Sequence, residues 1–161
     1  MIVRPFNNYG PRQHPEKVIP RFITQALAGE ALTIHGDGHA RRDWLYVDDD
    51  AEAIEAIIAT PIDRLAGEVV NVATGVDISV ADIADLVLDA VGETDSTKVY
   101  VPERLGQVDR HIGSTDKMAA LTGWRARTSF ADGLEQTVAW YRENEAWWRS
   151  VLGHSRHVSS S

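Results

Sequence analysis

Apolar residues recur every three or four positions in several segments of the chain, and glycine, proline or a capping side chain bounds each segment. This spacing is typical of amphipathic helices whose apolar stripe faces a core. The helices predicted in this way run from about 18 to 28, 49 to 60, 80 to 91, 116 to 121 and 129 to 148.

Two of these helices begin with a recognisable cap. Ser79 and Ser129 each stand three residues before an aspartate, Asp82 and Asp132, in a Ser-x-x-Asp pattern. A serine hydroxyl in this place accepts a hydrogen bond from a free N–H group of the first helical turn. We therefore expect both helices to start directly after these serines.

Short apolar runs lie between the helices and predict strands. They occupy residues 1–3, 31–35, 43–47, 68–72 and 98–101. The run Val69–Val72 is apolar except at Asn71, which is typical of a strand covered on both faces in a parallel sheet. Because strands and helices alternate, the pattern predicts an α/β fold with mainly parallel pairing.

Composition narrows the class of protein. The 161 residues are 43% hydrophobic and 25% charged, as in one ordinary globular domain. The formal net charge of -8 argues against nucleic acid or an anionic membrane as the main partner, since both reward clustered lysine and arginine. No apolar run approaches the ~20 residues of a membrane span. The sequence has no cysteine, hence no thiol nucleophile, and we expect a cytoplasmic protein.

The two ends of the sequence suggest how the domain is bounded. Because a domain rarely starts on a buried strand, the opening Met1–Val3 is expected to be an interior point of a longer protein. The polar stretch after Gly153 predicts a disordered tail over 153–161. Residues 1–152 then form the folded region.

The strongest candidate for ligand chemistry is the run from Gly36 to Asp50. A turn at Gly36 and Gly38 is followed by Arg41 and Arg42, which enter a strand directly. A guanidinium group can hold two oxygens of a phosphate or carboxylate at once, and Arg42 is the better placed of the two. The alternative is a solvated arginine pair on a surface turn.

Three consecutive aspartates, Asp48 to Asp50, end this run. A metal site would need further ligands, and no His or Cys cluster supports one. They stand where the next helix begins, so we expect them in the N-cap and first turn, where carboxylates satisfy free N–H groups. No metal and no catalytic residue is assigned to the chain.

Other polar residues stand where an anionic ligand is commonly held. Lys17 precedes a helix, whose N-terminus favours anions. Asn71 lies near the C-terminal end of a strand, where α/β sheets collect ligands, although it is as compatible with an asparagine bonded to its own turn. The polar loop after residue 102 contains Arg104 and Gln107. No Gly-x-Gly-x-x-Gly loop occurs, so these residues alone do not form a complete dinucleotide site.

Five motifs in fixed order resemble the C-terminal half of the dTDP-glucose 4,6-dehydratases, members of the extended short-chain dehydrogenase/reductase superfamily. They are NNYGP, PEKVIP, GDGxxxRDWLYVDD, VVNVATG and WYRENEAWW, and the resemblance spans about residues 2–150. It implies the small substrate-binding domain plus the last strands and helices of a Rossmann-type parallel sheet, without the Gly-rich NAD loop or the catalytic Tyr-x-x-x-Lys pair. The region 1–152 would bind a nucleotide-diphosphate sugar of the dTDP- or UDP-glucose type.

The resemblance also implies roles for single residues. Asn7 corresponds to a residue near the nicotinamide of NAD, and Arg42 to the arginine that grips the diphosphate. The other implied substrate contacts are Asn8, Lys17, Val18, Thr33, Ile34, His35, Asn71, Arg104 and Gln107.

One departure from the dehydratase pattern leaves the reaction open. The loop usually reads Arg-Pro-Gly-His-Asp, but here it reads Arg-Leu-Gly-Gln-Val from Arg104 to Val108, which is closer to epimerases and decarboxylases of the superfamily. A UDP-sugar 4-epimerase or decarboxylase, or a non-catalytic nucleotide-sugar-binding module, is therefore the alternative. A third interpretation is an interaction protein, because exposed strand edges promote association, and we expect a homo-oligomer.

Overall fold

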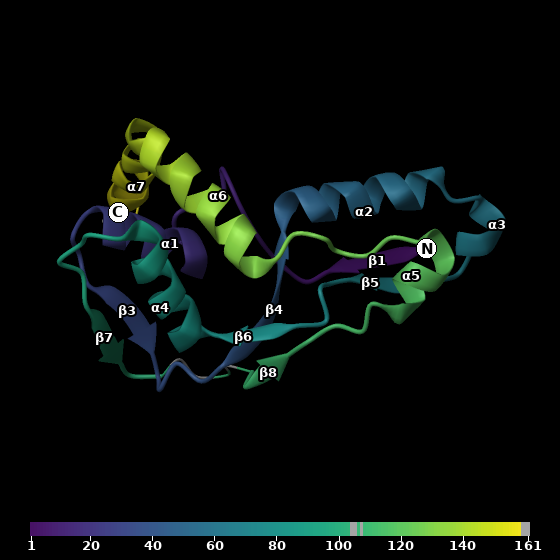
Figure 1. The fold of residues 1–161 in the computed structure, drawn as a ribbon, viewed down its shortest axis with the longest axis horizontal. Coiled ribbons are helices and arrows are strands. Elements are labelled where there is room, and N and C mark those ends of the chain that lie inside the picture. Colours follow the sequence, from purple (N-terminus) through teal and green to yellow (C-terminus); the bar gives the residue numbers. More distant parts are fainter. Residues whose placement is uncertain (104–105, 107, 159–161) are drawn as a thin grey trace.

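The computed structural model describes residues 1–103, 106 and 108–158 (Figure 1). Its strands are β1 Ile2–Pro5, β2 Asn7–Tyr9, β3 Leu32–His35, β4 Arg41–Tyr46, β5 Val69–Val72, β6 Asp77–Ser79, β7 Lys98–Val101 and β8 Arg110–His111. Its helices are α1 Val18–Leu27, α2 Val47–Ala59, α3 Ile62–Leu65, α4 Val80–Val91, α5 Asp116–Thr122, α6 Phe130–Glu143 and α7 Glu145–Val158.

Parallel pairing dominates the strands, as the sequence predicts. β1 pairs with β5, β2 with β4, and β3 with β7, all in parallel. β4 also pairs with β8 in parallel and with β6 in the antiparallel sense. With helices between the strands, the predicted α/β class is confirmed.

Strand β4 lies between the two hydrophobic cores of the described structure. Trp44 and Tyr46 belong to the larger core, together with α1, α4, α6 and Trp148 of α7, whereas Leu45 belongs to the smaller core of β5, α2 and α5. Successive side chains of a strand point to opposite faces, so one strand supplies both cores. Figure 1 shows the two groups of helices on either side of β4.

Both predicted serine caps are confirmed. The Ser79 hydroxyl accepts a hydrogen bond from the Asp82 N–H at 3.0 Å, and the Ser129 hydroxyl accepts one from the Asp132 N–H at 3.1 Å. α4 ends at Gly92, where φ is +78°, a conformation that glycine adopts without strain.

The prediction of one last long helix is wrong. Asn144 leaves the helical conformation, with φ -113° and ψ 38°, and its side-chain amide donates to the Trp140 carbonyl at 2.8 Å. The chain turns there from α6 into α7 (Figure 1). α7 is fixed by Trp148, which is buried and donates from Nε1 to the Tyr141 carbonyl at 2.9 Å.

The predicted tail over 153–161 is also revised. α7 continues through Gly153 to Val158, because Trp148 and Leu152 anchor the helix against the larger core and glycine inside a helix costs only about 1 kcal/mol. Residues 159–161 lie outside the described residues.

The β1–β5 pair is covered on one face only among the described residues. Val70 and Val72 point into the smaller core, so Val69 and Asn71 lie on the opposite face. Ile2 on the neighbouring strand is 55% exposed. In the part of the chain that the structure describes, no helix is long and apolar enough to cross a membrane.

Candidate functional site

Arg42 lies on β4 with a paired strand on each side. It is in register with Ile78 of β6 and with His111 of β8. Its Nη1 donates to the Arg41 carbonyl at 2.8 Å, and no carboxylate among the described residues comes within 4.0 Å of it. The guanidinium group therefore keeps hydrogen-bonding capacity for an anion.

Arg41 differs from its neighbour, because acidic groups surround it. Its Nε lies 3.4 Å from Asp77 Oδ2, its Nη1 lies 3.6 Å from Asp82 Oδ2, and its Nη2 donates to the Asp77 carbonyl at 2.8 Å. Arg110 also binds Asp77, and this hydrogen bond lowers the pKa of the Asp77 carboxyl. Of the two arginines, Arg42 is thus the one without an acidic partner in the described structure.

The two asparagines of β2 are held by partners on β4 and α2. Asn7 donates from Nδ2 to the Asp43 carbonyl at 2.9 Å. Asn8 donates from Nδ2 to Asp50 Oδ2 at 2.7 Å, while its buried Oδ1 has no hydrogen-bond partner. Gln13 Nε2 donates to the Asn8 carbonyl at 2.7 Å. Both predicted contacts therefore have fixed orientations.

The predicted contacts on α1 lie at the start of that helix. Lys17 is exposed at the N-cap position and has no side-chain cap. Val18 is partly buried and packs against the larger core. The first-turn N–H groups thus lack a capping side chain, as in helix ends that receive anions.

The predicted contacts on β3 divide by face. Thr33 and His35 are partly exposed, and His35 Nδ1 lies 3.3 Å from the Pro102 carbonyl. Ile34 is 0% exposed and belongs to the larger core, because alternation along the strand turns it inward. A contact from Ile34 to a ligand would therefore be made by its main chain, and the assignment of Ile34 stays a prediction.

Of the remaining predicted contacts, the structure describes Asn71. Asn71 is partly exposed on β5, in register with Arg4 of β1. Three residues later, Thr74 is bonded to β4 through Asp43, which links Asn71 to the neighbourhood of Arg42. Arg104 and Gln107 lie outside the described residues.

Asp43 is the residue that sequence reasoning missed. Its side chain is 0% exposed, and its Oδ1 accepts from the Thr74 N–H at 2.9 Å and from the Thr74 hydroxyl at 2.7 Å. Its Oδ2 accepts from the Gly75 N–H at 2.9 Å and from the Gly113 N–H at 3.3 Å. A charged residue directly before the apolar run Trp44–Tyr46 was the available signal, because a charged group that is buried with such a run must find partners.

The three aspartates Asp48 to Asp50 lie in the first turn of α2, as expected, but they do not cap it. Tyr46 is the N-cap residue. Asp49 is buried and accepts from the Thr128 N–H at 3.0 Å, and Asp50 accepts from Asn8. Within the described ranges, no group of three His, Cys, Asp or Glu residues is arranged to hold a metal.

The residues of this chain could contact only part of an NAD molecule. The sequence contains no glycine-rich strand-to-helix loop for a pyrophosphate, and Asn7 is the one predicted contact with NAD. One N–H of its amide bonds the Asp43 carbonyl, and the second N–H and the amide oxygen keep capacity for a ligand.

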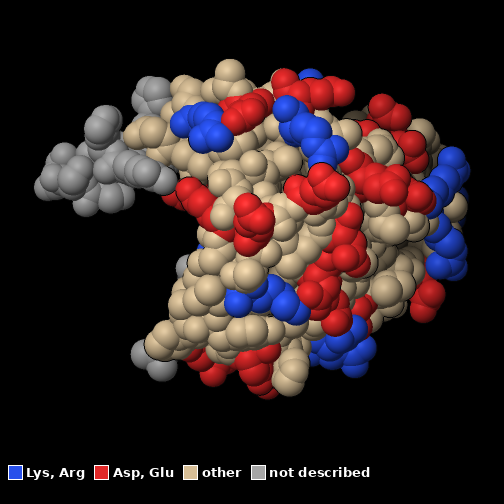
Figure 2. All heavy atoms as spheres, turned by 60° about the vertical axis from the view of Figure 1, so that its left-hand side comes forward, with Lys and Arg blue, Asp and Glu red and all other residues tan. Residues whose placement is uncertain are grey.

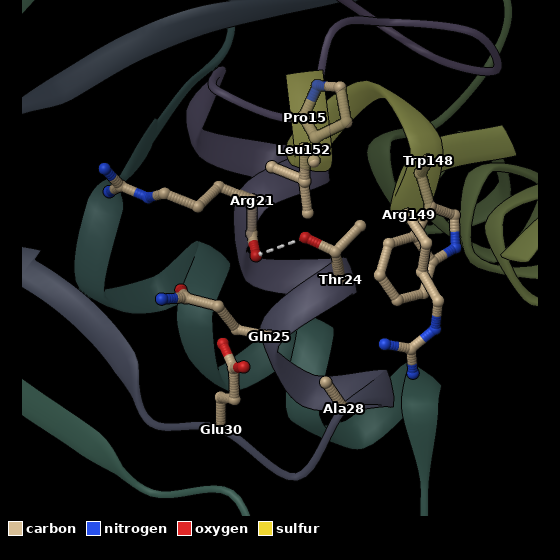
Figure 3. A pocket seen from close by; sticks show the side chains of 10 residues that line it. Pro15, Arg21, Thr24, Gln25, Ala28, Glu30, Trp148, Arg149 and Leu152 are labelled. Atoms are coloured by element: carbon tan, nitrogen blue, oxygen red, sulfur yellow. Dashed lines mark hydrogen bonds between the residues drawn. The ribbon is translucent and has the colours of Figure 1, made fainter. Parts of the chain in front are cut away.

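One pocket of the described structure lies apart from the predicted contacts. It has a volume of about 350 Å³ and runs between α1 and α7, where the side chains of Thr24, Trp148 and Leu152 face it (Figure 3). None of the predicted ligand contacts that the structure describes lines it. Arg21 at its edge donates from Nη2 to the Thr33 carbonyl at 3.1 Å.

The surface charge gives phosphate groups few places to bind. On the face shown in Figure 2, acidic side chains form a broad band and basic ones occur in small separate groups. With a formal net charge of -8, a phosphate must be held by a few placed side chains rather than by a basic surface.

Comparison with known proteins gives one consistent picture. Residues 1–73 match the NAD dependent epimerase/dehydratase family. The chain is 38% identical over 151 residues to a dTDP-glucose 4,6-dehydratase from Streptomyces niveus. These residues cover 94% of this chain and 44% of that protein. It is 40% identical over 141 residues to the low-salt glycan biosynthesis protein Agl12 from Haloferax volcanii, covering 88% of this chain and 44% of the relative.

Solved structures show the same relationship. The dTDP-glucose 4,6-dehydratase DesIV from Streptomyces venezuelae, with NAD and TYD bound, matches with a TM-score of 0.86 and 38% identity over 93% of this chain and 46% of that chain. The UDP-glucose 4-epimerase from Thermotoga maritima, with UDP-glucose, matches with a TM-score of 0.83 and 34% identity. The match covers 89% of this chain and 46% of that chain.

The solved structures that the chain resembles therefore confirm the predicted α/β fold. The chain spans a little under half the length of the proteins that it matches. Over almost all of its own length, it is similar in sequence and in α/β fold to NAD-dependent dehydratases and epimerases named for nucleotide sugars.

Proposed function

We propose that residues 1–152 form the nucleotide-sugar-binding portion, the C-terminal half, of an NAD-dependent sugar-nucleotide 4,6-dehydratase of the dTDP-glucose type. The main support for the proposal is the environment of Arg42. It lies between two paired strands and has no acidic partner among the described residues, while Arg41 beside it is surrounded by carboxylates. A positioned guanidinium fits the diphosphate of a nucleotide sugar.

The other proposed contacts extend from Arg42 toward the two ends of such a ligand. The nucleotide is contacted by Lys17 and Val18 at the start of α1 and by Thr33, Ile34 and His35 on β3. Asn8 serves the sugar side, and Asn71 belongs to the same pocket as Arg42. Asn7 lies toward the nicotinamide, and Arg104 and Gln107 are proposed as further contacts of the nucleotide. NAD supplies hydride chemistry when bound, and this chain contributes binding and orientation of the substrate.

Calorimetric titration tests the proposal. The chain is titrated with dTDP-glucose, UDP-glucose and GDP-mannose. We expect selective binding of one of them, weakened by ~1–3 kcal/mol in Arg42→Ala because a charge-assisted contact is lost. Arg125→Ala removes one exposed positive charge after α5 and is expected to leave the affinity unchanged. Equal losses in both variants, or no binding at all, would reject the assignment of Arg42.

The second candidate is the same portion of a UDP-sugar 4-epimerase or decarboxylase. It is favoured by the match to the Thermotoga epimerase and by the loop sequence from Arg104 to Val108. Preference for UDP-glucose over dTDP-glucose in the titration would reject the dTDP-glucose type and favour a UDP-sugar enzyme.

We further propose that the chain alone has no catalytic turnover and acts as a binding module. The proposal rests on the missing Gly-rich loop and Tyr-x-x-x-Lys pair within these residues. Formation of a 4-keto sugar by the isolated chain with added NAD and dTDP-glucose would refute it. A cytoplasmic location and self-association stay predictions.

A further inference from the structure

We propose that Asp43 is the positioning residue of this site: its buried carboxylate fixes both strands that flank Arg42, and its carbonyl orients Asn7. The inference rests on the proposed function for the identity of the ligand. The arrangement itself follows from the contacts of Asp43.

The carboxylate of Asp43 gathers segments that are far apart in the sequence. It accepts four hydrogen bonds from Thr74, Gly75 and Gly113, and no Lys, Arg or His nitrogen in the described structure lies within 4.0 Å of it. Three N–H groups and one hydroxyl donate to the two carboxylate oxygens, two donors to each, so the buried charge is compensated by dipoles alone. Each of these partners is therefore needed, since a buried carboxylate without partners is unfavourable.

These partners stand directly beside the strands that pair with Arg42. Gly75 lies two residues before β6, and Gly113 lies two residues after His111 of β8. Because Arg42 is in register with Ile78 and His111, holding the two glycines at Asp43 fixes β6 and β8 against both edges of β4 at Arg42.

Close packing reinforces the junction on the β8 side. A Cβ atom on Gly113 would lie 2.6 Å from Ala73 Cβ and 2.8 Å from the Phe6 ring, so only glycine allows this approach. The Phe6 ring also stacks on His111, with centroids 4.5 Å apart. Phe6 precedes Asn7, whose amide donates to the Asp43 carbonyl at 2.9 Å. Both Asn7 and Arg42 are thus oriented through one residue.

Asp43→Asn is the direct test, made in the full chain. The amide has one acceptor oxygen in place of two, so the Thr74–Gly75 and Gly113 contacts cannot all persist. We expect amide exchange at Gly75 and Gly113 to speed up about tenfold or more. The NMR signals of Arg42 Nε–H and the Asn7 amide should move because β4 shifts, although the main-chain carbonyl that Asn7 bonds is kept. The dissociation constant for thymidine diphosphate should rise about tenfold.

Asp49→Asn is the matched control. Asp49 is also buried and also accepts a backbone N–H, but from Thr128. This variant should change the Thr128 amide and leave the Arg42 and Asn7 signals and the dissociation constant within about twofold. If Asp43→Asn leaves those signals and the affinity as they are in the wild type, the proposal is wrong.

A second pair of variants decides the matter if Asp43→Asn does not fold. Thr74→Val removes the hydroxyl that donates to Asp43 Oδ1, whereas Thr74→Ser keeps it. We expect Thr74→Val to shift the Arg42 signal and weaken thymidine diphosphate binding, and Thr74→Ser to restore both. Equal behaviour of the two variants overturns the proposal. A wild type that binds neither thymidine diphosphate nor UDP refutes the proposed function, while the signals of Arg42 and Asn7 still test the positioning by Asp43.

Discussion

Identical side chains perform different tasks according to what surrounds them. Asp43 accepts four hydrogen bonds inside the molecule, Asp49 ties α2 to the segment before α6, and Asp77 forms ion pairs with Arg41 and Arg110. A buried carboxylate is stable only when donors surround it, so each of these contacts fixes a loop as well as a charge.

Tyr9 and Tyr141 should give the chain an alkaline limit of stability. Burial raises the pKa of both hydroxyls well above the ordinary value near ~10, and the nearby Tyr46 adds to the shift at Tyr9. A pKa raised in the folded state contributes stability that is present below about pH 10 and is lost as the pH rises further. The free energy of unfolding should therefore fall above that pH.

Denaturant unfolding at increasing pH, with ultraviolet detection of tyrosinate, measures this effect. The tyrosinate signals of Tyr9 and Tyr141 should appear together with loss of fold. Tyr141→Phe should flatten the alkaline decline, whereas Tyr100→Phe, at a side chain that is 51% exposed, should not. Ionisation of all four tyrosines in a chain that keeps its native circular dichroism would contradict the argument.

At the residue scale, the order of residues entering the strand favours Arg42 over Arg41 as the ligand contact. In the structure Arg41 has carboxylates around it, and the ligand contact of Arg42 stays a prediction. Asp43 could not be assigned in this way, because its partners lie 31, 32 and 70 residues away. Long-range pairing of this kind leaves no local spacing to detect.

At the scale of elements, the cap of α4 sets a measurable part of stability. Ser79 is buried at 5% exposure, and its hydroxyl accepts from the Asp82 N–H. Ser79→Ala should lower the free energy of unfolding by about 1 kcal/mol, because one first-turn donor loses its partner. Urea denaturation measures the change. Ser114→Ala, at an exposed serine outside any helix, should shift it by less than about 0.5 kcal/mol. Equal changes in the two variants would mean that the Ser79 cap does not contribute to stability.

Element prediction succeeded for long periodic segments and failed for short ones. α1 and α4 show continuous apolar stripes, so their period could be read directly. β2, β6 and β8 have two or three residues each and depend on pairing with β4, which no alternation in so short a segment reveals. The break at Asn144 was missed because Trp140 and Trp147 stay seven residues apart, a spacing that one unbroken helix would also produce.

At the scale of the whole molecule, one helix face has no cover among the described residues. Val47, Ile54 and Ile58 lie on one side of α2 and are 36%, 38% and 78% exposed, and Ile62 follows at 74%. Positions 47, 51, 54 and 58 recur at helical spacing, so they form a single apolar stripe. The β1–β5 pair beside it has an uncovered face with Ile2 55% exposed. Exposed stripes and open strand edges favour association.

Sedimentation velocity over a range of concentrations should therefore show dimers or larger species. Ile58→Lys should weaken this association about tenfold or more, because a charge replaces the most exposed apolar side chain of the stripe. Leu86→Lys places the same charge on α4, at a leucine that is 36% exposed, and should have little effect. If the wild type is a monomer throughout, the prediction fails. If it associates and Ile58→Lys does not change this, the contact lies at the open side of β1–β5, where Ile2→Lys should then weaken it.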